Sequence, residues 1–235
     1  MPRRWSWSRD RRREPLISSP ANCRTDTMST PEGTRERLIL TAEQLFASKG
    51  IESVSLREIA RTAGQKNVAA MQYHFGDREG LFTAILEFRM SHIDSYRTSL
   101  LQACDADGKG EDIAALLRCL VVPLVEHIRQ AGLDSHYIEF LARLQVSYPE
   151  FLAEASLTRP WQASVKTISA RIHAGMSGTD EQRNQRQLML GVCMIHSVAA
   201  FERGLREGRH DLSELESFKE NLIAGLCGMV TAQPL

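Results

Sequence analysis

Hydrophobic residues recur at intervals of three and four along most of the chain, and few alternating β-branched runs interrupt them. This spacing places apolar side chains on one face of an α-helix, so it predicts an all-α fold. The first expected helix starts near Thr30 or Thr34 and stops at Gly50. Its apolar stripe consists of Leu38, Ala42, Leu45 and Phe46.

Two short helices are expected next, at about 56–63 and 67–74, separated by a turn at Gly64. Ser55 can cap the first of them, and Val68, Met71 and Phe75 of the second can face a core. The second helix is too short to be stable alone. Three short helices with a tight glycine turn form a helix-turn-helix, which lets one helix project into the major groove of DNA.

After Gly76 the pattern changes to longer helices, expected at about 78–103, 112–130, 135–147, 151–174, 180–207 and 213–231. Glycine-containing loops separate most of them, and no internal repeat is present. With the three short helices this makes about nine helices. The second part of the chain is therefore expected to form a helical bundle.

Residues 1–29 contain seven arginines among Trp, Ser and Pro and show no periodicity, so this segment is expected to be disordered. It can be interpreted as a basic arm that follows the DNA backbone. It can also be an untranslated leader, with Met28 as the true start. No apolar core of ~7–15 residues follows the arginines, which argues against a secretory signal.

Composition narrows the class of protein. The chain has 235 residues, of which 43% are apolar and 25% charged, as expected for a globular protein. No uncharged apolar run of ~18 residues is present, so no membrane association is expected. The 29 basic and 29 acidic residues balance, so any contact with DNA must come from a local surface.

Residue types that carry catalysis or bind metals are present without the spacing that such sites need. The five cysteines are far apart and resemble reduced core thiols, and the seven histidines show no ligand spacing on one helix face. No set of nucleophile, base and acid and no phosphate-binding glycine loop is found. We therefore expect no metal, no cofactor and no enzymatic activity.

The run from Thr34 to Phe82 has the order of elements T-R-E-R-L-I-L-T-A-E-Q-L-F-A-S-K-G, S-L-R-E-I-A-R-T-A-G and M-Q-Y-H-F-G-D-R-E-G-L-F. This run resembles the DNA-binding domain of tetracycline-repressor-like (TetR) regulators. The resemblance implies a helix-turn-helix domain at 30–77 and a ligand-binding and dimerisation domain at 78–235. It implies a homodimeric, cytoplasmic regulator of transcription, most often a repressor, which a small-molecule effector releases from a palindromic operator.

The resemblance also suggests which residues contact DNA, although the chain carries one residue more than the usual spacing between Gly64 and His74. Gln72 and Asn67 can form paired hydrogen bonds with adenine, and Ala69 and Ala70 are small enough to meet a thymine methyl. Candidates for phosphate contacts are Thr34, Ser55, Lys66, Tyr73, His74 and Arg78. Alternatively, Tyr73 and His74 mainly pack against neighbouring helices and Ser55 is only a cap.

The larger part of the chain contains candidates for an effector pocket. Aromatic and sulfur side chains adapt to apolar ligands, although such residues are more often simply core. The candidates are Met90, Tyr137, Phe140, Trp161 and Met194. Pro123 lies inside an expected helix, where it either opens space for a ligand or merely bends a packed helix.

The last two long helices carry apolar stripes and small residues that permit close helix approach. By resemblance, they pair with their copies in a second subunit. An alternative function is a helical protein-interaction module that has lost DNA binding, which the neutral charge balance would suit. Salt-dependent binding to DNA distinguishes the two.

Overall fold

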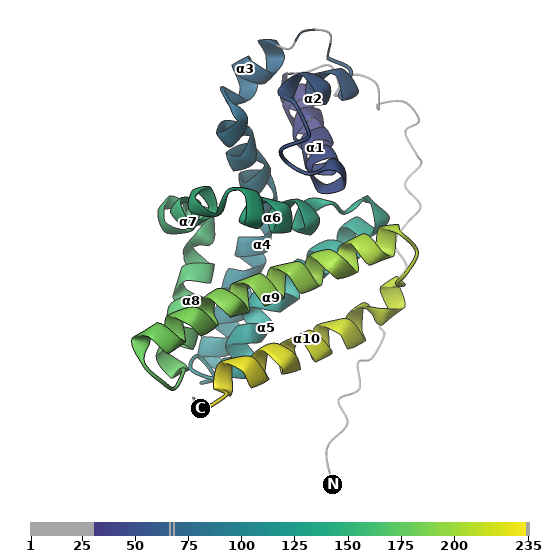
Figure 1. Ribbon diagram of the computed structural model, residues 1–235. Helices are drawn as coiled ribbons and strands as arrows, with labels where there is room; N and C mark the ends of the chain where they lie inside the picture. Colours follow the sequence, from purple (N-terminus) through teal and green to yellow (C-terminus); the bar gives the residue numbers. More distant parts are fainter. Residues whose placement is uncertain (1–30, 66, 68, 234–235) are drawn as a thin grey trace, which may run out of the picture.

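The structure of the protein, a computed structural model, describes residues 31–65, 67 and 69–233 (Figure 1). These residues form ten α-helices and no strand. The helices are α1 (Pro31–Lys49), α2 (Leu56–Thr62), α3 (Ala69–Phe75), α4 (Arg78–Ala106), α5 (Ile113–Ala131), α6 (Tyr137–Ser147), α7 (Pro149–Thr158), α8 (Ala163–Gly175), α9 (Asp180–Arg206) and α10 (Leu215–Thr231). The prediction of an all-α fold is confirmed.

The prediction of a single helix at 151–174 is wrong, because two helices occupy this stretch. α7 ends at Thr158 and α8 starts at Ala163, with a short 3-10 turn at Pro160–Gln162 between them. Arg159 is extended, with φ −92° and ψ 133°. A proline ring clashes with the backbone of the residue before it and disfavours the helical region there, so Pro160 explains the break.

The helices form two parts that share a core. α1, α2 and α3 lie together at one end, α4 runs from there along the molecule, and α6 and α7 cross its middle (Figure 1). α9 and α10 lie side by side across the other end and pack against each other. A continuous cluster of buried apolar residues extends from Leu38 in α1 to Val230 in α10.

The first turns of α4 belong to the core of the small N-terminal part. Leu81, Phe82 and Ile85 are fully buried, and the Phe82 ring lies 5.6 Å from the ring of Phe46 in α1. Because α4 packs into both parts, residue 78 is a helix start and not a break in packing. The division into domains at 30–77 and 78–235 stays a prediction.

The turn between α2 and α3 depends on Gly64. Its φ is +74°, a conformation that a side chain disfavours. The Gly64 N–H donates to the Arg61 carbonyl at 3.0 Å, and the Gln65 N–H donates to the Ala60 carbonyl at 2.8 Å. These two bonds satisfy the free carbonyls at the end of α2 and turn the chain toward α3.

α9 is the one helix among the described residues with the length and hydropathy of a membrane span. It packs closely against α6, and its residues Leu190, Val198 and Phe201 are buried in the common core. A helix that is buried on one side in a bundle has the same composition as a span. We therefore attribute its apolar character to packing.

Candidate DNA-binding surface and internal cavity

α3 is buried on one side and exposed on the other. Met71 and Phe75 point into the core, whereas Ala69 and Gln72 are exposed and Tyr73 is 83% exposed. Such a large exposure excludes the alternative that the Tyr73 ring packs against neighbouring helices. We call the outward residues Ala69, Ala70, Gln72 and Tyr73 the recognition face.

His74 is half-buried at the margin of the recognition face. Its ring centre lies 5.1 Å from that of Tyr73 and 5.9 Å from that of the buried Phe75. The imidazole therefore packs between an exposed and a buried ring. This position is compatible with a phosphate contact and equally with a packing role, so both interpretations of His74 stay open.

Asn67 caps the N-terminus of α3. Its Oδ1 accepts a hydrogen bond from the Ala69 N–H at 2.9 Å, and its carbonyl accepts one from the Ala70 N–H at 3.2 Å. The predicted paired contact with adenine needs the side-chain oxygen, one lone pair of which is already engaged by the cap. The Asn67 amide can still donate from its nitrogen. Lys66, the other residue expected at this end, lies outside the described residues.

Ser55 also acts as a cap. Its Oγ accepts from the Glu58 N–H at 3.1 Å at the start of α2, while its hydroxyl hydrogen remains a possible donor to phosphate. Thr34 is half-exposed in the first turn of α1. Both hydroxyls therefore lie near helix N-termini, as the sequence led us to expect.

Arg78 is occupied within the protein. Its guanidinium donates to the carbonyls of Ile51 and Val54, both at 2.7 Å, and lies over the Phe46 ring at 5.9 Å. These contacts attach the turn after α1 to the start of α4. The structure thus gives Arg78 a positioning role and does not favour the predicted phosphate contact.

Sequence reasoning missed two cations next to the recognition face. Arg57 and Arg61 are exposed on α2, and neither was among the predicted DNA contacts. The single acid between Leu56 and Phe75, Glu58, forms an ion pair with Lys49 at 2.6 Å. The local excess of basic residues in this segment is the signal that could have identified them.

A partly open cavity of about 410 Å³ lies in the larger part of the molecule, between α4, α5, α6, α7, α8 and α9, and the exposed Leu188 and Val192 lie at its rim. We call it the bundle cavity. Two of the predicted ligand contacts, Met90 and Met194, line it. Leu120 and Leu124, on either side of Pro123 in α5, line it as well. The cavity has the volume of a typical site for a small molecule.

The other three predicted ligand contacts lie elsewhere. Tyr137 and Phe140 are fully buried in the packed core, where the Phe140 ring stacks at 5.9 Å on Phe46 and the Tyr137 ring meets His127 at 5.5 Å. Trp161 lines a separate hollow beside Pro160 and α4. Aromatic character identified core residues in this case, because the fold turns that side of α6 away from the bundle cavity.

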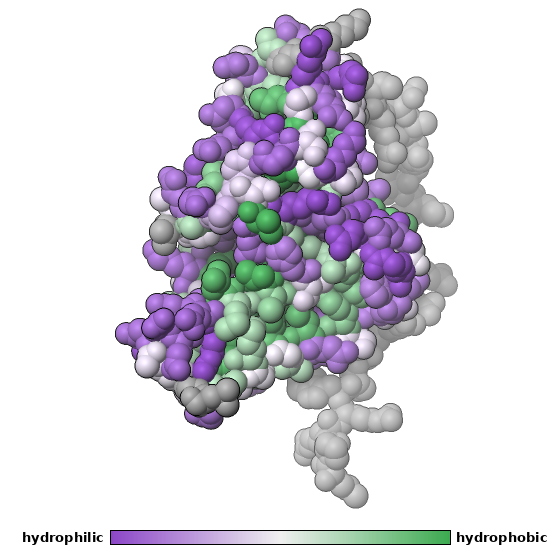
Figure 2. All heavy atoms as spheres, in the orientation of Figure 1, coloured by the Kyte–Doolittle hydropathy of each residue, from purple (hydrophilic) through white to green (hydrophobic). Residues whose placement is uncertain are grey.

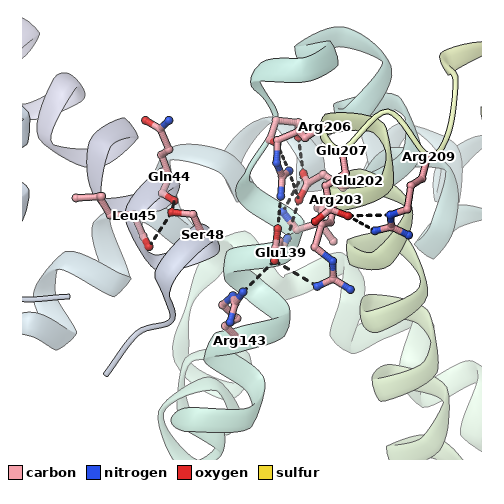
Figure 3. Close-up of polar contacts among 12 residues, drawn as sticks. Gln44, Leu45, Ser48, Glu139, Arg143, Glu202, Arg203, Arg206, Glu207 and Arg209 are labelled. Carbon is pink, nitrogen blue, oxygen red and sulfur yellow. Dashed lines mark hydrogen bonds and ion pairs between the residues drawn. The ribbon is translucent and has the colours of Figure 1, made fainter. Parts of the chain in front are cut away.

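A polar cluster joins α6 to α9 (Figure 3). Glu202 is 1% exposed and accepts hydrogen bonds from Ser135 Oγ at 2.5 Å and from the Glu139 N–H at 2.7 Å. Burial raises the pKa of Glu202, and the hydrogen bond from Ser135 opposes that rise. The buried carboxylate of Glu139 pairs with Arg206 and, at 3.3 Å, with Arg203.

The same helix α6 also faces the N-terminal part. Arg143 donates to Glu139 at 3.1 Å and borders a hollow of about 310 Å³ that also touches Gly50 and Ile51 after α1. On its other side, Leu141 and Gln145 line the bundle cavity. α6 therefore lies between the cavity and the helix-turn-helix.

The outer side of α9 and α10 is apolar. Hydrophobic residues gather over these two helices in Figure 2. Leu188, Met189 and Val192 of α9 are exposed. On α10, the small residues Ala224, Gly225 and Gly228 are exposed. We call these six residues the apolar face.

Among residues 31–65, 67 and 69–233, no group of three or more His, Cys, Asp or Glu side chains is placed to hold a metal ion. The described free cysteines are Cys104, Cys119, Cys193 and Cys227. Burial raises the pKa of Cys119 to about 11, so this thiol stays protonated near neutral pH.

Comparison with known proteins agrees with this geometry. Residues 38–85 match the family model for bacterial regulatory proteins of the tetR family. The HTH-type transcriptional regulator AcrR of Shigella flexneri is 25% identical over 139 residues, which cover 59% of this chain and 60% of AcrR. The chain thus matches somewhat less than two thirds of the length of this relative.

Two solved structures match most of the chain. A crystal structure assigned to a TetR-family transcriptional regulator from Rhodococcus sp. covers 83% of this chain and 99% of its own, with 19% identity and a TM-score of 0.50. A structure of NalD from Pseudomonas aeruginosa, described as the secondary repressor of the MexAB-OprM multidrug efflux pump, covers 83% of this chain and 98% of its own, with 23% identity and a TM-score of 0.49.

The family match begins at Leu38 in α1 and ends at Ile85 in α4. It therefore spans the capped helix α2, the glycine turn and the exposed helix α3. By these matching residues and the helices they form, the segment from Leu38 to Ile85 is similar to the tetR family of bacterial regulatory proteins.

Proposed function

We propose that this protein is a cytoplasmic, DNA-binding regulator of transcription that acts as a homodimeric repressor and is released from a palindromic operator by a small-molecule effector. The observation that carries the proposal is the recognition face, where Gln72 and Tyr73 project from a helix whose other side is buried. A glutamine amide can pair with adenine in the major groove, and a tyrosine hydroxyl suits a phosphate.

A protein-interaction module is the second candidate function. The exposed Tyr73 would suit a protein partner as well as DNA, because tyrosine is common in protein interfaces. Arg57 and Arg61 on the preceding helix favour DNA, since exposed cations beside a recognition helix neutralise phosphates. The two functions differ in how strongly salt weakens binding.

The apolar face supports the proposal of a homodimer. α9 and α10 pack against each other within the chain, and a second copy would cover Leu188, Met189 and Val192 on their outer side. Glycine at 225 and 228 leaves room for close helix approach, since a Cβ atom at either position would meet nothing within 4 Å. Two recognition faces could then read half-sites ~34 Å apart.

Two helices could transmit a signal from the bundle cavity to the recognition face. α4 lines the cavity with Met90 and Arg97, and Arg78 of the same helix holds the turn after α1, ~18 Å before Met90 and ~28 Å before Arg97 along the helix axis. α6 borders the cavity on one side and Gly50 on the other. An effector that shifts either helix would change the spacing of the two recognition faces, so effector and DNA binding would be linked.

The test is a binding titration of the full chain with the DNA upstream of its own gene at several salt concentrations. We expect the logarithm of the affinity to fall linearly with the logarithm of the salt concentration. Gln72→Ala should relax discrimination at particular base pairs by ~1–3 kcal/mol. The matched control is Gln102→Ala, an exposed glutamine on α4 away from α3, which should change nothing.

A phosphate contact should behave differently from a base contact. Arg61→Ala should weaken binding to all sequences alike and reduce the salt slope by ~1. Identical behaviour of Gln72→Ala and Arg61→Ala would refute this division of roles. Binding that does not depend on salt would favour the protein-interaction module.

A further inference from the structure

The bundle cavity contains one formal charge. Among the described residues that line it, Arg97 of α4 is the single ionisable side chain, and it is 2% exposed. The rest of the wall is mostly aliphatic or sulfur-containing. A buried cation that faces an apolar hollow is costly unless an anion compensates it.

Arg97 has incomplete compensation within the protein. Its ion pair joins Nη1 to Asp94 Oδ1 at 3.5 Å, which is longer than the ~2.7–3.2 Å of a good hydrogen bond. The same Asp94 oxygen also accepts a hydrogen bond from Ser164 Oγ. Arg97 Nε is buried without any partner. The guanidinium therefore has donors left for a ligand.

Asp94 and the glutamines of the wall are the polar neighbours of Arg97. Burial lowers the pKa of Arg97, and the Asp94 carboxylate opposes that effect. The positive charge of Arg97 and the negative charge of Asp94 leave the pair neutral overall. Gln145 and Gln187 also line the cavity, and the side-chain amide nitrogen of each can donate a hydrogen bond to a carboxylate. Their buried Oε1 atoms have no partner and would need a donor, which a carboxylate does not supply. The wall thus offers one cation and three amides, those of Gln145, Gln162 and Gln187, and no acid lines it.

We propose that the bundle cavity binds an apolar carboxylic acid, whose carboxylate pairs with Arg97 and whose hydrocarbon part contacts the aliphatic wall. This inference rests on the proposed function, because it names the chemical class of the effector. The guanidinium donors that Asp94 leaves free, Nε among them, can bind the oxygens of a carboxylate. A doubly charged phosphate would bring two negative charges to a site where Asp94 already balances Arg97, so it is disfavoured more strongly than a carboxylate.

Isothermal titration calorimetry on the full chain tests the proposal with three probes that share one alkyl chain. Decanoate is the carboxylate, decanol the neutral analogue and decylamine the cation. We expect decanoate to bind ~10- to 100-fold more tightly than decanol, because a hydrogen bond to a charged group supplies that factor. Decylamine should bind most weakly, since it would bring a second cation next to Arg97.

Variants locate the effect. Arg97→Met should lower the affinity for decanoate ~10- to 100-fold and leave decanol unchanged. Arg97→Lys should keep part of the preference for the acid. Arg171→Met is the matched control, because Arg171 pairs with Asp105 away from the cavity, and it should keep the full preference.

The probe comparison on the unaltered chain decides the proposal even if a variant does not fold. Equal affinity for decanoate and decanol, tighter binding of decylamine, or no binding of any probe would overturn it. If the Arg97→Met variant does not fold, the double variant Asp94→Asn with Arg97→Met takes its place in the test, because it removes both charges of the pair. A preference for decanoate that survives in this double variant would also refute the role of Arg97.

The calorimetry needs no DNA, so it separates this inference from the proposed function. Absence of salt-dependent DNA binding by the unaltered chain would count against the regulator and leave a carboxylate site standing. Normal DNA binding together with no preference for decanoate would remove the carboxylate site and leave the regulator.

Discussion

The carboxylate of Glu43 in α1 accepts two hydrogen bonds from the Arg89 guanidinium of α4, from Nε at 2.7 Å and from Nη2 at 2.9 Å. Glu43 is 2% exposed, and burial raises its pKa while Arg89 opposes the rise. Arg89 is 20% exposed. This pair joins the first helix of the N-terminal part to the helix that enters the bundle.

Arg89→Met should lower the free energy of unfolding by about 3 kcal/mol, because it leaves a buried carboxylate without its partner. Urea denaturation near neutral pH measures the loss. Replacement of both residues, Glu43→Leu with Arg89→Met, should recover most of it, since no uncompensated charge then remains buried. An unchanged unfolding free energy in the single variant would contradict this account of the pair.

His127 in α5 should make the protein sensitive to acid. Burial, with a smaller contribution from Arg89, lowers its pKa from 6.5 to about 4, and its Nε2 has no partner. A depressed folded pKa means that the neutral imidazole supports stability above the unfolded value of 6.5. That stability is lost as the pH falls from 6.5 toward about 4, by at most ~3 kcal/mol.

The acid effect can be assigned with a pair of variants. His127→Leu should make the unfolding free energy less dependent on pH in this window. His92→Leu, at an exposed position of α4, should leave the dependence as it is in the unaltered chain. Denaturation curves at several pH values compare the three proteins, and parallel pH profiles for all of them would exclude His127 as the cause.

Val192 lies on the apolar face and tests the proposed dimer. Val192→Glu should convert a dimer to monomers, because a carboxylate would be buried between two apolar surfaces. Sedimentation velocity measures the state. Val146→Glu is the matched control, since Val146 is an exposed valine on α6 outside the apolar face. A monomeric unaltered chain would contradict the proposal directly.

The sequence predicted helices better than it predicted which side chains reach a site. Apolar residues at intervals of three and four located nearly every helix, because a helix that buries one face carries its apolar residues at those intervals. It did not separate Met90, which lines the bundle cavity, from Phe140, which is packed in the core. Both residues are apolar and helical, and only the arrangement of the neighbouring helices distinguishes a cavity wall from a filled core.

Local chemistry near the recognition face was partly readable. The capping role of Ser55 follows from its place before a helix, and the exposure of Gln72 follows from the period of α3. The two bonds from Arg78 to the carbonyls of Ile51 and Val54 could not be predicted. They join segments distant in sequence, and no local pattern specifies such a contact.

Gly80 holds the end of the recognition helix close to α4. A Cβ atom at this position would fall well inside the contact distance of the Phe75 carbonyl oxygen, the last residue of α3. Helix propensity alone predicts that Gly80→Ala stabilises α4 by up to ~1 kcal/mol. The clash is with a backbone atom, which cannot rotate away, so we expect a loss of ~1–3 kcal/mol instead.

The displacement of α3 should also reduce DNA affinity at protein concentrations and temperatures where the variant remains folded. Gly175→Ala is the matched control, because its Cβ would meet Cδ1 of Ile113, the mobile end of a side chain, and α8 lies far from the recognition face along the fold. Thermal denaturation and DNA titration of both variants provide the comparison. If Gly80→Ala proved as stable and as tightly bound to DNA as the unaltered chain, Phe75 would not need glycine at position 80.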